Sequence, residues 1–329
     1  MTVDKQLVAD LAVNARVDST FAVRSRSLAA FRNKPGQYLN LTLADRTGDL
    51  AARAWDNAEA LAECCPPGSV VRVRGRVDEY QGKLQLIIEA LEPCEPGQIN
   101  PTDYLPASKR EPLDMLEEVD AAIAGVEDPH LKALLEAFFL DKAFRRRFAH
   151  AAGAKSLHHS FVSGLLEHTV SVARILWTLQ ESHPQLDRDL LTAGALLHDI
   201  GKTEELITGT TIEYTDSGRL LGHTVLTDRM VRDRLRDVPD FPPLLADRLM
   251  HMLLSHHGQK EYGAPIVPMT AEACALHYAD NLDAHVQYFS QVVEQGAGSG
   301  NRWSDYQRLF DRYIYLGEAG QGEGEPPPS

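Results

Sequence analysis

Residues 196–202 read Leu-Leu-His-Asp-Ile-Gly-Lys and place an imidazole beside a carboxylate at the end of an apolar helical stretch. The preceding periodicity predicts a helix over 187–200, and Gly201 is a natural helix stop. Adjacent residues on a helix point about 100° apart. His198 can therefore serve one metal ion while the Asp199 carboxylate bridges towards a second.

Four more candidate ligands lie on either side of this stretch, each within a segment that reads as helix: His168, His223, His256 and Asp280. Neutral imidazole and carboxylate bind divalent transition metals, and helical bundles build such sites in their cores from facing helices. A single histidine on a helix is more often a surface or hydrogen-bonded core residue. The ordered set instead predicts a metal-dependent hydrolase. The spacing leaves open whether His256 or His257 coordinates the metal ion. We favour His256 as the ligand and expect His257 to lie behind it or to contact a substrate phosphate.

The region around these residues is predicted to be helical from 113 to 316. The expected helices are 113–124, 128–151, 160–182, 187–200, 222–237, 242–256, 270–292 and 301–316. A β-prone stretch followed by Asp216-Ser-Gly predicts a small hairpin over 208–219. The Gly- and Pro-rich tail, 317–329, has no apolar residues to bury beyond one alanine and is predicted to be disordered.

The first 94 residues read as β structure. Strands are predicted near 21–28, 38–45, 50–55, 69–77 and 83–91, with a helix-like insertion at 57–65. Five short strands with this insertion fit a Greek-key barrel of the OB type. Residues 95–112 are rich in Pro, Asn and Asp and are predicted to link the two domains. The fold class is therefore α+β multidomain, with a five-stranded OB barrel followed by an all-α bundle.

Basic and aromatic side chains suggest which ligand the barrel binds. Arg72, Arg74 and Arg76 alternate along one predicted strand, so they share one face. Aromatic rings close by in sequence come from Tyr38, Trp55 and Tyr80. A basic groove with stacking rings is how OB barrels hold single-stranded nucleic acid. The alternative is a polar barrel exterior with aromatic residues in the core.

The composition of the chain narrows the class of protein further. The chain has 329 residues, 43% hydrophobic and 24% charged, as in a soluble globular protein. A formal net charge of −14 argues against a protein that coats nucleic acid non-specifically, though not against a nucleic-acid enzyme. The sequence has no apolar run of membrane-spanning length, no signal-peptide pattern and four cysteines without CxxC spacing. These features predict a cytoplasmic protein with reduced thiols and no membrane partner.

The ordered histidines and aspartates resemble the HD-domain superfamily of metal-dependent phosphohydrolases, whose pattern is H…HD…H…H…D. The resemblance implies that His168, His198, Asp199 and Asp280 hold one ion. His223 and His256, with Asp199 bridging, would hold a second. Paired cations polarise a phosphoryl group and activate water, and Lys202 would stabilise charge on the phosphoryl oxygens. The resemblance favours Mn²⁺ or Co²⁺, while the ligand set also suits Fe, Ni or Zn.

An OB domain ahead of an HD domain resembles the YhaM family of 3′→5′ exoribonucleases over roughly residues 15 to 315. The motifs that carry this likeness include Gly164-Leu-Leu-Glu-His-Thr, Leu254-Ser-His-His-Gly and Leu276-His-Tyr-Ala-Asp-Asn-Leu-Asp. The resemblance implies removal of 5′-mononucleotides from the 3′ end of single-stranded RNA, or of single-stranded DNA. Lys155, His158 and His159, just ahead of the His168 helix, are candidate contacts to substrate phosphate.

Two other functions fit the residues. One is a phosphohydrolase of small or cyclic nucleotides in which the OB domain serves assembly, for instance as a homo-oligomer. The other is a non-catalytic single-strand-binding protein with a structural metal. Turnover of a labelled oligonucleotide against free nucleotides separates these alternatives.

Overall fold

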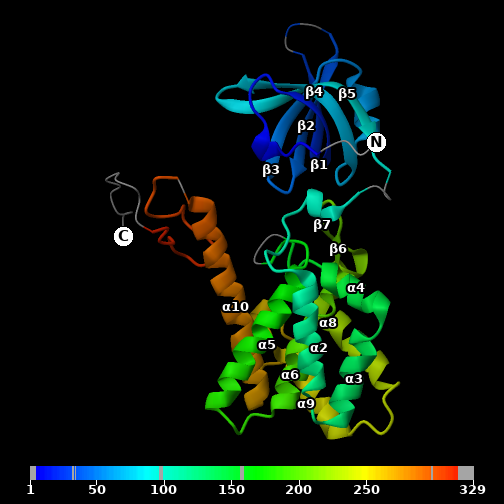
Figure 1. Ribbon diagram of the computed structural model, residues 1–329, viewed down its shortest axis with the longest axis vertical. Coiled ribbons are helices and arrows are strands. Elements are labelled where there is room, and N and C mark those ends of the chain that lie inside the picture. The colour runs from blue at the N-terminus through cyan, green and yellow to red at the C-terminus, as the bar shows by residue number, and fades with distance from the viewer. Residues whose placement is uncertain are drawn as a thin grey trace. The chain divides into compact units, whose positions relative to one another are not determined.

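The computed structural model describes residues 5–31, 33, 35–95, 99–155, 159–297 and 299–317 (Figure 1). The chain divides into two compact units. The first comprises Met1–Lys109 with Leu206–Tyr214, and the second Arg110–Glu205 with Thr215–Ser329. The change from one unit to the next at Lys109 falls within the predicted linker. The predicted disordered tail, apart from Gly317, lies outside the described residues.

The first unit is a closed five-stranded barrel, as predicted. Its strands are β1 (Arg16–Ala30), β2 (Gln37–Asp45), β3 (Gly48–Ala54), β4 (Val70–Tyr80) and β5 (Lys83–Pro93), in the order β1-β2-β3-β5-β4. All neighbouring pairs are antiparallel except β3 with β5, which run parallel. Helix α1 (Ala58–Cys64) follows β3, and a short 3₁₀ turn, η1 (Val8–Asp10), precedes β1.

Strand β1 closes the barrel because it pairs with two partners in succession. Its first half, up to Ala22, pairs with β4, and its second half pairs with β2. A register shift between Val23 and Ser25 marks the bend between the two halves. Phe21, Val71 and Val73 are fully buried inside the barrel. The alternating arginines of β4 therefore point outwards, as their spacing predicts.

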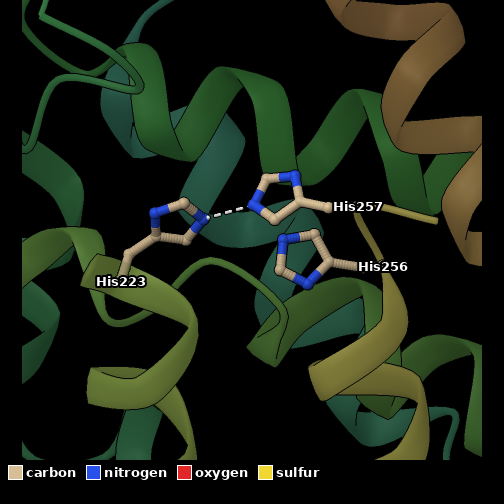
Figure 2. Close-up of side chains that lie close together, drawn as sticks. All are labelled: His223, His256 and His257. Carbon is tan, nitrogen blue, oxygen red and sulfur yellow. Dashed lines mark hydrogen bonds between the residues drawn. The ribbon is translucent and has the colours of Figure 1, made fainter. Parts of the chain in front are cut away.

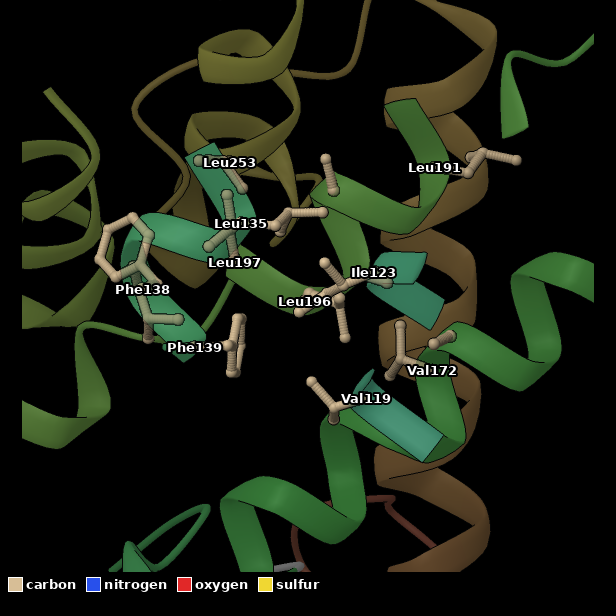
Figure 3. Packing of buried hydrophobic residues seen from close by; sticks show 14 of the residues in the cluster. Val119, Ile123, Leu135, Phe138, Phe139, Val172, Leu191, Leu196, Leu197 and Leu253 are labelled. Atoms are coloured by element: carbon tan, nitrogen blue, oxygen red, sulfur yellow. The ribbon is translucent and has the colours of Figure 1, made fainter. Parts of the chain in front are cut away.

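The second unit is a helical bundle. Its helices are α2 (Pro112–Ala124), α3 (Pro129–Phe139), α4 (Lys142–His150), α5 (Gly164–Ser182), α6 (Arg188–Leu197), α7 (Lys202–Glu205), α8 (Asp216–Leu235), α9 (Pro243–Ser255) and α10 (Ala271–Gly296). Apolar side chains from most of these helices form one continuous core, part of which Figure 3 shows. Helix α6 is buried along nearly its whole length, so the stretch that follows it begins deep inside the bundle. Among the described residues, no helix is both long and apolar enough to cross a bilayer.

Several predicted elements differ from the structure. The helix expected over 128–151 is two helices, because the Asp141 side chain accepts hydrogen bonds from the amides of Ala143 and Phe144 and starts α4. The hairpin expected over 208–219 lies earlier, as β6 (Leu206–Thr208) and β7 (Ile212–Tyr214). The predicted turn Asp216-Ser-Gly instead begins α8, capped by Thr215.

The helix expected over 301–316 is wrong. This segment folds back on itself, with bridges between Trp303 and Tyr315 and between Gln307 and Arg312. The backbone amide of Leu316 donates to the carbonyl of Arg302, which closes the two arms. The aromatic residues of this segment lie mostly three or four positions apart, as on a helix, but such residues are also frequent in extended chains. We call residues 302–316 the C-terminal hairpin.

Candidate metal centre

Five helices bring the predicted ligands to one place in the second unit. His168 comes from α5, His198 and Asp199 directly follow α6, and His223 comes from α8. His256 follows α9, and Asp280 lies on α10. All six side chains are at least half-buried, and His198 and His256 have no exposed surface. The structure thus brings together the whole predicted set, although the residues span more than one hundred positions in sequence.

Asp199 lies between two groups of histidines. Its Oδ2 atom is 3.5 Å from His198 Nε2 and 3.6 Å from His168 Nε2. Its Oδ1 atom is 3.4 Å from His223 Nε2 and 3.7 Å from His256 Nε2. Each carboxylate oxygen thus faces its own pair of imidazoles. This is the geometry in which one carboxylate can bridge two ions.

Four histidines are held so that Nε2 faces the centre. Nδ1 of His198 lies 2.8 Å from the Ala195 carbonyl, and Nδ1 of His256 lies 2.7 Å from the Leu253 carbonyl. Two other histidines use carboxylates instead. Nδ1 of His168 is 2.7 Å from Asp283 Oδ2, and Nδ1 of His223 is 3.2 Å from Glu205 Oε2. A proton on Nδ1 of each ring leaves the Nε2 lone pair for a metal ion, which is the usual arrangement of metal-binding histidines.

His257 also reaches the centre. Its Nε2 atom is 2.9 Å from Nε2 of His223, and Figure 2 shows these two nitrogens approaching each other beside His256. Ligand atoms of His223, His256 and His257 lie within 4.8 Å of one another, as do those of His168, His198 and Asp280. Both His256 and His257 therefore face the second group, where the sequence favoured His256 alone.

A pair of buried polar atoms shows that the centre fits a cation. Asp199 Oδ1 and His256 Nε2 are buried and have no hydrogen-bond partner among the described residues. An unpaired buried carboxylate oxygen is costly, and so is an imidazole lone pair that faces only other acceptors. A divalent ion between them would satisfy both atoms. The nitrogen and oxygen donors suit divalent transition metals and do not single out one of them.

Electrostatics within the centre favours charged carboxylates. Burial opposes ionisation of Asp280, but His168, whose Nε2 lies 3.1 Å away, keeps the pKa of that carboxyl well below its usual range. Burial lowers the pKa of His168, but hydrogen bonds to Asp280 and Asp283 raise it to about 10, so a metal ion would displace the proton from its Nε2 on binding. Burial lowers the pKa of His256 to about 4, which keeps that imidazole neutral at pH 7. Anionic carboxylates and a neutral imidazole are the forms that bind metal.

Two glycines allow the backbone to form the centre. A side chain at Gly201 would place its Cβ 2.2 Å from the His223 carbonyl oxygen and 2.7 Å from the Thr227 amide nitrogen. Only glycine therefore lets the loop after Asp199 approach α8 so closely. Gly222 has a φ of 74° and breaks the helical path of α8 just before His223.

Two carboxylates behind the histidines were missed in the sequence. Asp283 accepts from His168, from His159 Nε2 at 2.8 Å and from the Ser171 hydroxyl. Glu205 accepts from the backbone amide of His223 at 3.0 Å as well as from its ring. The available signal for Asp283 was its position three residues after Asp280, on the same face of a helix. Nothing in the local sequence pairs Glu205 with His223.

The sequence also predicted substrate-binding or catalytic roles for four other residues of this unit: Lys202, Lys155, His158 and His159. Lys202 is buried, and its Nζ lies 2.6 Å from Asp199 Oδ2. His159 is buried beneath His168 rather than facing solvent, and Lys155 is half-buried. His158 lies outside the described residues.

On the barrel, aromatic rings gather where several strands end. Tyr38 lies 5.0 Å from Trp55 and 5.4 Å from Phe31, measured between ring centroids. The Arg53 guanidinium lies between 5.2 and 5.7 Å from the rings of Tyr38, Trp55 and Tyr80. We call these five residues the ring cluster. It joins all three predicted aromatics with two residues that the sequence did not single out.

The predicted arginines of β4 do not form a free basic stripe. Arg72 makes a two-point ion pair with Asp18 at 2.7 and 2.9 Å, and Arg74 pairs with Glu92 at 3.2 Å. Arg76 is exposed further along the strand. Neighbouring strands thus supply acids that offset much of the positive charge, and the ring cluster is the more distinctive feature of the barrel surface.

Each of the two units matches a family of known proteins. Residues 16–93 match the family described as an OB-fold nucleic acid binding domain, and residues 165–285 match the HD domain. The 3′-5′ exoribonuclease YhaM of Geobacillus sp. (strain WCH70) is 34% identical over 288 residues, which is 86% of each chain. YhaM of Bacillus subtilis (strain 168) is 34% identical over 286 residues, covering 86% of this chain and 89% of its own. The chain belongs to the YhaM family of 3′-5′ exoribonucleases.

Proposed function

We propose that this chain is a metal-dependent 3′→5′ exoribonuclease that shortens single-stranded RNA and releases 5′-mononucleotides. The observation that carries the proposal is the position of Asp199, with one carboxylate oxygen towards His168 and His198 and the other towards His223 and His256. A carboxylate between two ligand groups suits a two-ion phosphodiesterase. The family relationship supplies the polarity and the RNA substrate.

The residues divide into two ligand groups. His168, His198 and Asp280 would hold one ion, and His223, His256 and His257 the other, with Asp199 shared. Divalent ions bound there would polarise the scissile phosphate and lower the pKa of water. Lys202 holds its ammonium against Asp199 within the buried centre, where it favours negative charge on phosphoryl oxygens. Asp283 and Glu205 keep the rings of His168 and His223 in place.

We propose that the barrel binds the single strand. Its ring cluster offers stacking surfaces and a guanidinium, which bind single strands with little sequence preference. Stacking tolerates both sugars, so single-stranded DNA is a second substrate. We further propose Mn²⁺ or Co²⁺ as the ion, a cytoplasmic location and assembly into homo-oligomers.

A labelled single-stranded oligoribonucleotide tests this function. With a 5′ label and Mn²⁺, the chain should produce a ladder of products shortened from the 3′ end. His198→Ala and Asp199→Ala should each remove the activity, as should a chelator. His183→Ala is the matched control, since that histidine is exposed at the end of α5.

Three outcomes would contradict the proposal in different ways. Hydrolysis of free mononucleotides or cyclic nucleotides without a ladder would favour a small-nucleotide phosphohydrolase. RNA binding without cleavage under any divalent ion would favour a non-catalytic binding protein. Activity that survives Asp199→Ala would remove the bridging carboxylate from the mechanism.

A further inference from the structure

A cavity of about 610 Å³ lies beside the metal centre, between α10 and the C-terminal hairpin. Its lining includes His257 and Asp280, which also face the metal centre. A molecule in this cavity would therefore lie directly beside the proposed ions. The volume falls within the range of about 300–1,000 Å³ typical of pockets for small organic ligands.

The C-terminal hairpin is attached firmly enough to form a wall. The Phe310 ring packs against three rings of α10, with centroid distances of 4.7 Å to His285, 5.0 Å to Tyr288 and 5.3 Å to Phe289. The Tyr288 hydroxyl donates to the Gln307 side chain at 2.7 Å. Arg312, which also lines the cavity, donates from Nε to the Phe310 carbonyl at 2.8 Å within the hairpin.

The part of the cavity lining outside the hairpin is linked to the metal-binding histidines by a hydrogen bond. It contains His277, whose Nδ1 lies 2.8 Å from the His256 carbonyl, and Tyr262 on the 3₁₀ turn η4 (Lys260–Tyr262). Tyr262 is 65% exposed, so its ring is open to a ligand. Asn281, next to Asp280 on α10, adds an amide that can both donate and accept.

Aromatic surfaces, one amide and one guanidinium around a cavity of this volume match a single nucleoside, while the carboxylates of Asp280 and Asp311 in the same lining leave its phosphate to the metal centre. Bases stack on such rings whatever their sequence. A longer stretch of RNA would need a groove rather than one pocket. The shared residues His257 and Asp280 would place such a nucleoside beside the groups that would hold the ions.

We propose that this cavity receives the 3′-terminal nucleoside of the RNA, with its base against Tyr262 and Phe310 and its 5′-phosphate at the metal centre. The inference rests on the proposed exoribonuclease function and assigns the part of the substrate that is released as mononucleotide. A pocket for one terminal nucleoside explains release of one nucleotide per cleavage.

Two esters with the same leaving group test the pocket. Uridine 5′-(4-nitrophenyl phosphate) carries the nucleoside, and methyl 4-nitrophenyl phosphate replaces it with a methyl group. Tyr262→Ala and Phe310→Ala should raise KM for the uridine ester roughly 5- to 150-fold, the range expected for one lost base stack. Kinetic constants for the methyl ester should stay as in the wild type. Inhibition by uridine 5′-monophosphate should weaken by the same factor as the uridine ester's KM rises.

Tyr278→Ala is the matched control, because Tyr278 is 66% exposed on α10 and does not line the cavity. Tyr262→Ala removes an exposed ring, so it tests the pocket even if Phe310→Ala loosens the hairpin. Unchanged KM for the uridine ester in Tyr262→Ala, with RNA still shortened from its 3′ end, would overturn the pocket and leave the proposed function standing. A wild type that cleaves both esters but does not shorten RNA would overturn the proposed function instead.

Discussion

Asp283 shows how a residue outside the predicted set can control the metal centre. It lies behind His168, where one carboxylate oxygen contacts both His168 and His159 and the other accepts from Ser171. The contact with His168 holds the ring so that Nε2 points to Asp280 and His198. Asp283 is therefore a positioning residue for the first ligand group.

Asp283→Asn should weaken metal binding because the amide no longer gives His168 a charged partner. Loss of such a carboxylate behind a histidine ligand typically lowers metal affinity by about 10- to 100-fold. Calorimetric titration of the metal-free protein with Mn²⁺ measures the change. Asp233→Asn, on the exposed side of α8, is the control. An affinity equal to that of the wild type would remove Asp283 from this role.

Gly201→Ala should move the loop that carries Asp199 away from α8. The added Cβ would lie 2.2 Å from one backbone atom and 2.7 Å from another, and backbone yields little. Overpacking of this kind costs about 1–3 kcal/mol of unfolding free energy, which urea denaturation measures. Gly125→Ala is matched to it, since there the nearest atoms lie 3.5 Å away and φ is −76°. Equal stability of the two variants would contradict the close approach at Gly201.

For single residues, the sequence shows which side chains can bind metal. It does not show which carboxylates hold those side chains in place. The order of histidines and aspartates predicts a set that the structure does bring together. Glu205 and Asp283 act through His223 and His168 from other helices, and such pairs follow from packing rather than spacing. Likewise, the spacing cannot show that Arg72 and Arg74 have acidic partners on neighbouring strands.

At the scale of elements, Asp141 decides where one predicted helix becomes two. Its carboxylate caps α4 and pairs with Arg234 of α8 at a distance of 2.7 Å. The hydrogen bond from Arg234, together with those from the amides of Phe144 and Ala143, lowers the pKa of Asp141 below its ordinary value. The charged carboxylate thus joins the start of α4 to α8.

This shift predicts a pH dependence of stability. Because the folded pKa is lowered, the charge of Asp141 stabilises the fold above the ordinary Asp pKa of about 3.9. The contribution is lost as the pH falls through the lower folded value. Asp141→Asn keeps a good capping residue but no charge. Wild type should be the more stable at pH 6, and urea denaturation should show the difference shrinking below about pH 4. A difference that is constant with pH would contradict the ion pair.

Apolar periodicity predicts most helices but does not resolve breaks or segments rich in rings. Residues 128–151 keep a helical period through Leu140 and Asp141, and only the capping contacts of Asp141 show the break. Residues 301–316 are spaced as a helix could be, yet their aromatic side chains pair across a hairpin and against α10. The five barrel strands were predictable because turn residues separate them and several of them alternate apolar and polar residues.

At the scale of the whole molecule, the two units offer different kinds of interaction with RNA. The helical unit provides charged groups and possible metal ligands that would act on one phosphodiester. The barrel provides rings that can stack several bases without reading them. Substitutions in the barrel should therefore change affinity for a strand and leave the hydrolysis of a small ester untouched.

Trp55→Ala provides this test, because Trp55 is 36% exposed within the ring cluster and contacts both Tyr38 and Phe31. Loss of one stacking ring costs about 1–3 kcal/mol per base, so the dissociation constant for a labelled oligoribonucleotide should rise roughly 5- to 150-fold. Fluorescence anisotropy in the presence of a chelator measures binding without cleavage. Tyr214→Ala, an exposed ring on β7 outside the cluster, should bind as the wild type does. If Trp55→Ala binds RNA normally, or slows hydrolysis of methyl 4-nitrophenyl phosphate, the ring cluster is not a separate RNA-binding surface, and the barrel must act through other residues.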